Sequence, residues 1–365
     1  MKNSLDVGGQ AVIEGVMMRG PRSMVIAVRR PDSSIIVKDG QWVPLFERMP
    51  WLKLPFIRGA VVMVEALING MQALSFSAEV SMDDEKKAAE AAEAAEAEEA
   101  GVDAPVNLHA KATEDDADFI APDPMTKGAI ALSLIFSLGL GVGLFIYLPH
   151  AGAAVIFNLV EGLPLSSEAP VEAPLFHLVV GIIKMTIFVC YVLAIRQMND
   201  IYRVFQYHGA EHKSIHAYEA GEELTVENAR KWPTYHPRCG TSFLVFVILI
   251  SIGFFAAVFP LLQAYLLPSN LSGALLNLVQ ASVKIPLMIP IAGLSYEFIK
   301  WAGRQKENRV LCWLGIPGRM VQKITTVEPD DDQLEVALVS LKRALEHEGA
   351  LDAPDYRNCT FVPAA

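Results

Sequence analysis

Cysteine is scarce in this 365-residue chain, and its four cysteines are widely separated. They are Cys190, Cys239, Cys312 and Cys359, and the first of them falls inside a long apolar run. Thiols so few and so scattered do not form the disulfide framework of a small secreted domain. The first apolar run begins only after residue 55, so the sequence also predicts no cleavable signal peptide.

Positive charge is also in short supply, with 30 Lys and Arg against 41 Asp and Glu. Residues 83–123 contain 14 acidic side chains and three lysines, and this excess equals the whole formal net charge of −11. The rest of the chain is close to neutral. It has no basic patch with interleaved aromatic residues, which argues against nucleic-acid binding. The Ala- and Glu-rich segment lacks an apolar stripe, so we predict a solvated linker.

Long apolar runs are what the chain has in abundance. Hydrophobic residues make up 52% of it and the mean hydropathy is +0.33, values that favour a membrane protein. Each of four runs is about long enough to cross a hydrocarbon core of roughly 30 Å. These predicted spans are residues 128–148, 175–195, 241–267 and 283–299. Prolines 286 and 290 in the fourth run are tolerated where neighbouring helices satisfy the freed carbonyls.

Lys and Arg are distributed unevenly between the connecting segments. Residues 196–240 contain six and residues 300–309 contain four, whereas residues 149–174 and 268–283 contain none. Positively charged loops stay in the cytoplasm. We therefore expect a multi-pass cell-membrane protein, in contact with the lipid bilayer, whose two termini and 196–240 loop are cytoplasmic.

The predicted fold class is mainly α: a polytopic helical bundle of about four transmembrane helices. A small N-terminal β-rich cytoplasmic unit and a cytoplasmic histidine-bearing helical loop complete it. The unit is placed at 1–54 because residues 24–29 and 35–37 resemble short strands separated by a turn. The remaining boundaries are 55–82 for an amphipathic, membrane-associated helix, 83–123 for the linker, 124–300 for the bundle with its loop, and 301–365 for a cytoplasmic segment with an amphipathic helix.

The candidate site lies in the polar stretch 207–242, which contains four of the eight histidines. His208, Glu211 and His212 form an H-x-x-E-H pattern, the inverted zincin order. On a helix the two histidines lie one turn apart on the same face and can bind one ion. The adjacent Glu211 is the candidate catalytic residue, positioned to take a proton from a metal-bound water. We expect this helix to stop at Gly221 and Thr225 to cap a second, short helix.

The third ligand is left open by the sequence. His236 is the first choice, Cys239 the second, and Glu14 or Glu297 the third. His216 and Glu219 also fall on the histidine face of the predicted helix. Zinc is the metal that suits imidazole and thiolate best. Four protein ligands would make the site structural, and three with a water would make it catalytic.

The sequence leaves two alternative roles for each of the other charged residues near the site. Glu14 either pairs with Arg19 inside the N-terminal unit or docks onto the histidine site as a ligand or base. Lys213 and Arg238 either mark the inner leaflet or bind a phosphate or lipid headgroup.

Several stretches resemble one family of bacterial membrane proteins. They are GGQAVIEGVMMRGP at 8–21, YHGAEHK at 207–213, GEELTVENARK at 221–231, HPRCGTSFL at 236–244, SYEF at 295–298 and QKITTVEPDDDQLEVAL at 322–338. In these motifs the chain is similar to the YqhQ-type proteins, domain-of-unknown-function family 1385. The resemblance implies a protein of the bacterial inner membrane and a predicted metal-dependent enzyme. His216 is not part of the family pattern.

Two hypotheses follow from the sequence. The first is a zinc-dependent membrane hydrolase acting at the cytoplasmic face on a peptide or lipid-linked substrate. The second is a non-catalytic membrane scaffold or partner-binding protein, in which the histidines form a structural metal site or polar cluster. A transporter built around Lys284 and Glu297 is a weaker third option, because four spans show no internal repeat.

Overall fold

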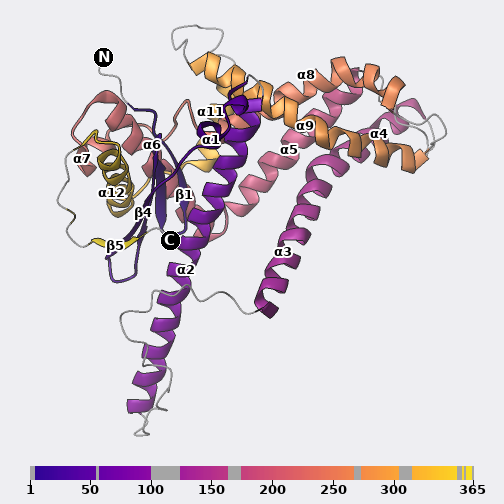
Figure 1. Ribbon diagram of the computed structural model, residues 1–365. Coiled ribbons are helices and arrows are strands. Elements are labelled where there is room, and N and C mark those ends of the chain that lie inside the picture. Colours follow the sequence, from indigo (N-terminus) through magenta and orange to yellow (C-terminus); the bar gives the residue numbers. More distant parts are fainter. Residues whose placement is uncertain are drawn as a thin grey trace.

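The computed structural model describes residues 5–54, 57–99, 124–162, 174–266, 273–303, 315–351, 356 and 359–363. A sheet flanked by helices forms one part of the molecule, and long apolar helices form the other (Figure 1). Cys312 and residues 100–123 of the predicted linker lie outside the described residues.

One five-stranded sheet contains both the N-terminal strands and the last strand of the chain. The strands are β1 (Gly8–Val12), β2 (Gly15–Arg19), β3 (Ser23–Arg29), β4 (Ile35–Gln41) and β5 (Cys359–Pro363), in that order across the sheet. The first four form an antiparallel meander, and β5 pairs with β4 in parallel. The small N-terminal sheet is confirmed, while the β1–β2 hairpin and the addition of β5 were not predicted.

Side chains alternate between the two faces of the sheet, and each face is covered by helix. Helix α12 (Asp331–His347) packs over β2 and β3, and α6 (Asn199–Ala220) packs beside it near β1. Val16, Met18 and Val25 belong to the core on that side. The other face meets α2 (Ile57–Glu99), where Phe76 and Val80 pack on the sheet. Burying each such side chain contributes about 1.5–3 kcal/mol.

Local signals set the bounds of the helices that carry the site. As predicted, α6 ends at Gly221, whose φ of 73° is a left-handed conformation that suits glycine. Thr225 accepts a hydrogen bond from the Asn228 N–H (3.3 Å) and caps α7 (Val226–Arg230), also as predicted. Asp330 and Gln333 form a capping box at the start of α12.

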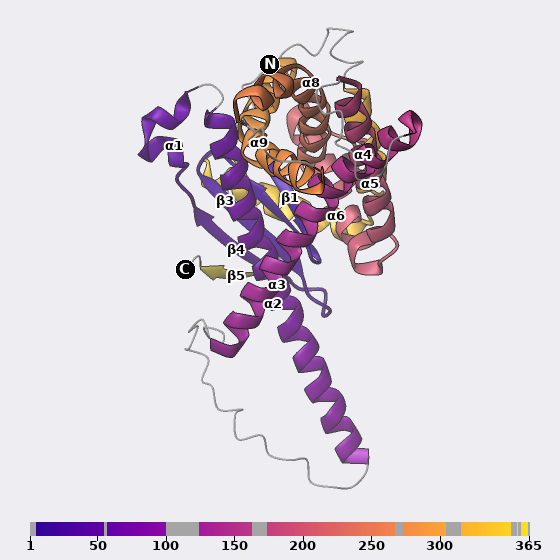
Figure 2. The same cartoon turned by 90° about the vertical axis from the view of Figure 1, so that its right-hand side faces the viewer.

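Within the described residues, five helical segments are long and apolar enough to cross a membrane, which indicates a multi-pass membrane protein. The helices concerned are α2, α3 (Pro124–Val142) continuing through a π-helical turn (Gly143–Tyr147) into α4 (Leu148–Glu161), α5 (Pro174–Ile195), α8 (Gly240–Leu266) and α9 (Gly273–Gly303). The fifth candidate is the α2 segment Ile57–Glu93, which was not among the four predicted spans. Instead of ending near residue 82, α2 is continuous to Glu99 and runs past the sheet (Figure 2). The short helix α1 (Leu45–Arg48) and a 3₁₀ turn (Pro50–Lys53) precede α2, and α11 (Ile316–Thr325) precedes α12.

Candidate functional site

Helix α6 carries most of the candidate site on one buried face. Tyr207 and Ala210 are fully buried in the core beside α12, which fixes the rotation of the helix against the sheet. Gly209 allows the close approach that this requires, because a Cβ at this position would lie 2.1 Å from the Val327 carbonyl oxygen. With the helix held in this way, its histidine face is directed toward the segment that precedes α8.

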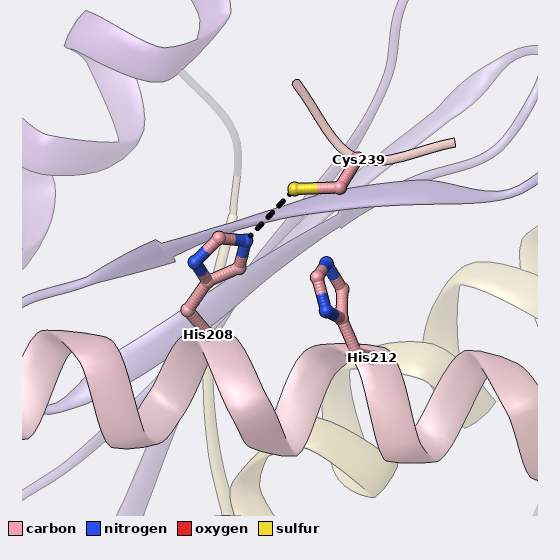
Figure 3. A group of neighbouring side chains, drawn as sticks. All are labelled: His208, His212 and Cys239. Atoms are coloured by element: carbon pink, nitrogen blue, oxygen red, sulfur yellow. Dashed lines mark hydrogen bonds between the residues drawn. The ribbon is translucent and has the colours of Figure 1, made fainter. Parts of the chain in front are cut away.

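Three of the predicted metal ligands come together. His208 and His212 rise from successive turns of α6 toward Cys239, as Figure 3 shows. Each offers one ligand atom, and the three atoms lie within 4.8 Å of one another. His208 Nε2 is 3.2 Å from Cys239 Sγ, which also contacts the Thr241 hydroxyl at 3.1 Å. We call His208, His212 and Cys239 the metal trio.

Hydrogen bonds to the backbone orient both imidazoles of the metal trio. His208 Nδ1 lies 2.9 Å from the Thr325 carbonyl oxygen, and His212 Nδ1 bonds the Thr234 carbonyl oxygen. A carbonyl only accepts, so each Nδ1 carries the proton and each Nε2 has its lone pair available. His212 Nε2 is buried and has no hydrogen-bond partner among the described residues. Burial lowers the pKa of His212, which keeps the ring neutral and able to ligate.

His236, the first choice for the third ligand, falls in a second group with His216 and Glu219. Its Nδ1 accepts the Arg238 N–H at 3.3 Å, so the proton of the neutral ring is on Nε2, 3.4 Å from Glu219 Oε1. Gln322 bonds both the N–H and the carbonyl of His236, at 2.9 and 2.8 Å. These contacts turn Nε2 of His236 toward the Glu219 carboxylate, although this atom, like Nε2 of His212, is buried and makes no hydrogen bond among the described residues.

Glu211 is buried at the edge of the sheet. It is 5% exposed, and burial raises the pKa of its carboxyl from 4.5 to about 7. The nearby Gly9 N–H partly opposes this rise in pKa. A Cβ on Gly9 would lie 2.7 Å from Glu211 Cγ, so only glycine fits here without displacing the carboxyl. The Gly8–Gly9 pair in the sequence is the signal that could have pointed to this contact.

A cavity of about 520 Å³ joins these residues, and the whole metal trio lines it together with Glu211. His236 lines it as well, and further walls come from β1, from other residues of α6, from Ala66 of α2 and from Leu244 of α8. Ala66 and Leu244 belong to candidate membrane-spanning segments. The cavity therefore lies where the sheet unit meets the apolar helices, and most of its lining away from the trio is apolar.

Glu14 and Arg19 are placed apart from the metal trio. Glu14 forms an ion pair with Arg203 and accepts a hydrogen bond from the Tyr207 hydroxyl at 3.2 Å. It thus fastens the tip of the β1–β2 hairpin to α6. The predicted Glu14–Arg19 ion pair is wrong, because the Arg19 guanidinium lies over the Trp42 ring, 4.7 Å from its centroid.

Lys213 and Glu297 also have partners elsewhere. Lys213 is buried, pairs with Glu328 and donates a hydrogen bond to the Arg230 carbonyl at 3.0 Å. Glu297 forms an ion pair with Arg58, which joins α9 to the start of α2. Lys284, the centre of the transporter alternative, lies within α9 with its ammonium 3.0 Å from His150 Nδ1.

The fold and the site together define a multi-pass membrane protein in which a sheet and α6 hold a histidine and cysteine cluster beside the apolar helices. The chain belongs to a family described as a protein of unknown function (DUF1385), whose model matches residues 54–347. It is 32% identical over 352 residues to "Uncharacterized protein YqhQ" of Bacillus subtilis (strain 168), covering 93% of this chain and 92% of that protein. No solved structure matches the chain.

Proposed function

We propose that this protein is a zinc-dependent membrane hydrolase whose site faces the cytoplasm and acts on a peptide or lipid-linked substrate. One observation carries the proposal: two imidazoles with available Nε2 atoms and one thiol converge on a cavity that a buried carboxyl also lines. Three protein ligands beside an open cavity leave a position for water or substrate, as in catalytic zinc sites.

The donor set suits zinc in kind and in spacing. Two imidazoles and a thiolate are the ligands that zinc prefers over calcium or magnesium. Zinc–nitrogen and zinc–sulfur bonds of about 2.0 and 2.3 Å at a tetrahedral angle place the two atoms about 3.5 Å apart. The separation between His208 Nε2 and Cys239 Sγ is 3.2 Å, so a small movement would admit the ion. Bound zinc would lower the pKa of a water and polarise a carbonyl.

Glu211 is suited to the proton transfers of hydrolysis. During hydrolysis of an amide, water adds to the carbonyl carbon and the C–N bond breaks, while one water proton passes to the leaving nitrogen. A carboxyl that lines the cavity can accept that proton and deliver it to the amine. A group whose pKa is close to the working pH does both efficiently.

The contacts of the sheet unit support four membrane crossings rather than five. The N-terminal sheet, α6, α12 and β5 pack into one body, so they occupy the same side of the membrane. Between β4 and α6 the chain must then cross an even number of times, yet α2, α3–α4 and α5 are three candidates. α2 packs on the sheet through Phe76 and Val80, so we infer that it lies beside the bilayer. The other four candidate segments, α3–α4, α5, α8 and α9, then cross the membrane.

Charge supports the orientation of these crossings. The segment that carries α6 and α7 contains six Lys and Arg, and the segments at the opposite end of the bundle contain none. Under the positive-inside rule this supports a cytoplasmic location for the sheet unit, the metal trio and both termini.

The second candidate is a non-catalytic scaffold, and one network favours it. Arg238 forms ion pairs with Asp6 (2.7 Å) and with Glu219, tying the N-terminal segment to the loop beside His236. A polar cluster of this kind needs no metal to hold the sheet unit together. Under this hypothesis loss of the metal trio lowers stability but removes no activity.

The decisive experiment measures zinc by mass spectrometry in detergent-purified wild type, His212→Ala and Cys239→Ser. We expect about one zinc per wild-type chain and a loss of most of it in both variants. His347→Ala is the matched control, since this histidine lies on α12 and pairs with Asp39. Wild type without zinc, or a His212→Ala protein with full occupancy, would refute the proposal.

A further inference from the structure

Strand β1 leaves one edge of the sheet unpaired beside the metal trio. It stands at one end of the strand order and pairs only with β2, with Gly9 opposite Met18 and Ala11 opposite Val16. Val12 and Gly15 flank the two-residue turn and form a hydrogen-bonded pair, so Gly9 stands in a non-hydrogen-bonded pair and its N–H faces the Glu211 carboxyl. Gly9 therefore directs its backbone groups away from the sheet.

By the geometry of the antiparallel ladder, Ala11 also directs its backbone groups away from β2. Alternate residues of such a strand direct their N–H and C=O to the same side. The carbonyl of Gly9 and both backbone groups of Ala11 therefore also point away from β2. Among the described residues, no hydrogen bond to another group is made by any of these three. Gly9 and Ala11 both line the cavity that holds the metal trio.

We propose that this edge binds the substrate, and that the substrate is an extended peptide lying along β1 as an added strand. The proposal rests on the zinc-dependent hydrolysis argued above and names its substrate class. Residues i and i+2 of a strand are about 6.7 Å apart, which is also the repeat of an extended peptide. Backbone pairing would give affinity, and the apolar walls at Val7, Ile215 and Leu244 would receive alternate side chains.

A peptide satisfies this edge and a lipid chain does not. The Gly9 carbonyl and the N–H and carbonyl of Ala11 need hydrogen-bonding partners on the substrate at the spacing of a strand. A peptide backbone supplies donors and acceptors at that spacing, and an acyl chain has neither. The walls contributed by Ala66 and Leu244 connect the edge to candidate membrane-spanning helices. The expected substrate is therefore an apolar peptide segment of a membrane-associated protein, and its scissile carbonyl would lie beside His208 and His212.

The test compares two zinc-binding probes on zinc-loaded, detergent-purified protein. One is the tripeptide hydroxamate acetyl-Leu-Ala-Leu-NHOH, which can pair with β1. The other is octanoyl hydroxamate, which has the same metal-binding group and no peptide backbone. Each is measured by calorimetry on wild type and on a variant in which Ala11 is replaced by lactic acid. That replacement exchanges the N–H for an ester oxygen and retains the methyl group.

We expect the peptide to bind wild type at least tenfold more tightly than the acyl probe. The lactic acid variant should lose about fivefold in affinity for the peptide, as expected for one hydrogen bond. Its affinity for octanoyl hydroxamate should stay within about twofold of wild type, which also shows that the site is intact. Equal binding of the two probes, tighter binding of the acyl probe, or an unchanged peptide affinity in the variant would overturn the peptide assignment while leaving the zinc site. Wild type that holds no zinc would instead overturn the hydrolase and this inference with it.

Discussion

Replacing the buried carboxyl Glu211 by an amide should make the zinc-free protein more stable at neutral and alkaline pH. Burial raises the pKa of Glu211 from 4.5 to about 7. A folded-state pKa above the unfolded one means that the folded protein holds a proton that the unfolded chain has released. The stability associated with this group is complete below pH 4.5 and is lost as pH rises to 7. At about 1.36 kcal/mol per pH unit, the loss is about 3 kcal/mol.

Glu211→Gln removes this dependence, because the amide is neutral at every pH and its oxygen can still face the Gly9 N–H. The free energy of unfolding should be equal for wild type and variant at pH 4.5, and higher for the variant by about 3 kcal/mol at pH 8. Unfolding in mixed micelles after treatment with a chelator, followed by tryptophan fluorescence, measures both. The matched control is Glu227→Gln, at an exposed carboxyl on α7, which should follow the wild-type profile.

Parallel pH profiles for wild type and Glu211→Gln would show that the carboxyl is not desolvated and would refute this reasoning. Repeating the measurement on the zinc-loaded protein provides a second test. A bound cation stabilises an ionised carboxylate nearby, so zinc should reduce the advantage of the variant at pH 8. An advantage that is the same with and without zinc would separate Glu211 from the metal.

Two further predictions test the local geometry. Gly9→Ala places a Cβ 2.7 Å from Glu211 Cγ and should cost about 1–3 kcal/mol in the free energy of unfolding, whereas Gly8→Ala, with nothing within 4 Å, should cost much less; equal losses from the two would contradict the close contact. Gln322→Leu removes the two hydrogen bonds that hold the His236 backbone and should also destabilise by about 1–3 kcal/mol. Its zinc content should match wild type if the metal trio is the ligand set, and a parallel loss of zinc would instead restore His236 as a ligand.

The parts of the fold that the sequence predicted are those with local causes. The end of α6 at Gly221 and the cap at Thr225 each depend on a few adjacent residues. Strand β5 joins β4 across more than 300 residues, and no local pattern records such a pairing. The β1–β2 hairpin escaped prediction because its strands are rich in glycine and methionine, and its turn holds Glu14 at a φ of 49°, where glycine or asparagine is usual.

The same distinction between local and distant causes applies to the candidate site. The pairing of His208 with His212 follows from helix periodicity, and the sequence predicted it. The grouping of Cys239 rather than His236 with this pair depends instead on where the segment before α8 places the two side chains, and distant parts of the chain hold that segment and the imidazoles. Thr325, which orients His208, lies 117 residues away in α11. No motif within the loop contains that information.

The location of the cavity ties the site to the membrane in a way that neither part of the fold alone would. Two of its walls, at Ala66 and Leu244, come from α2 and α8, and the other walls come from β1, from α6 and from the segment before α8. β1 is held against α6 by Glu14 and Arg203, and α2 is held against α9 by Arg58 and Glu297. A sheet unit separated from the apolar helices would therefore keep His208 and His212 on α6 but lose the walls that exclude water from them. Because water exclusion raises the pKa of Glu211 and strengthens every charge interaction in the cavity, the chemistry proposed for this protein requires the intact membrane-bound chain.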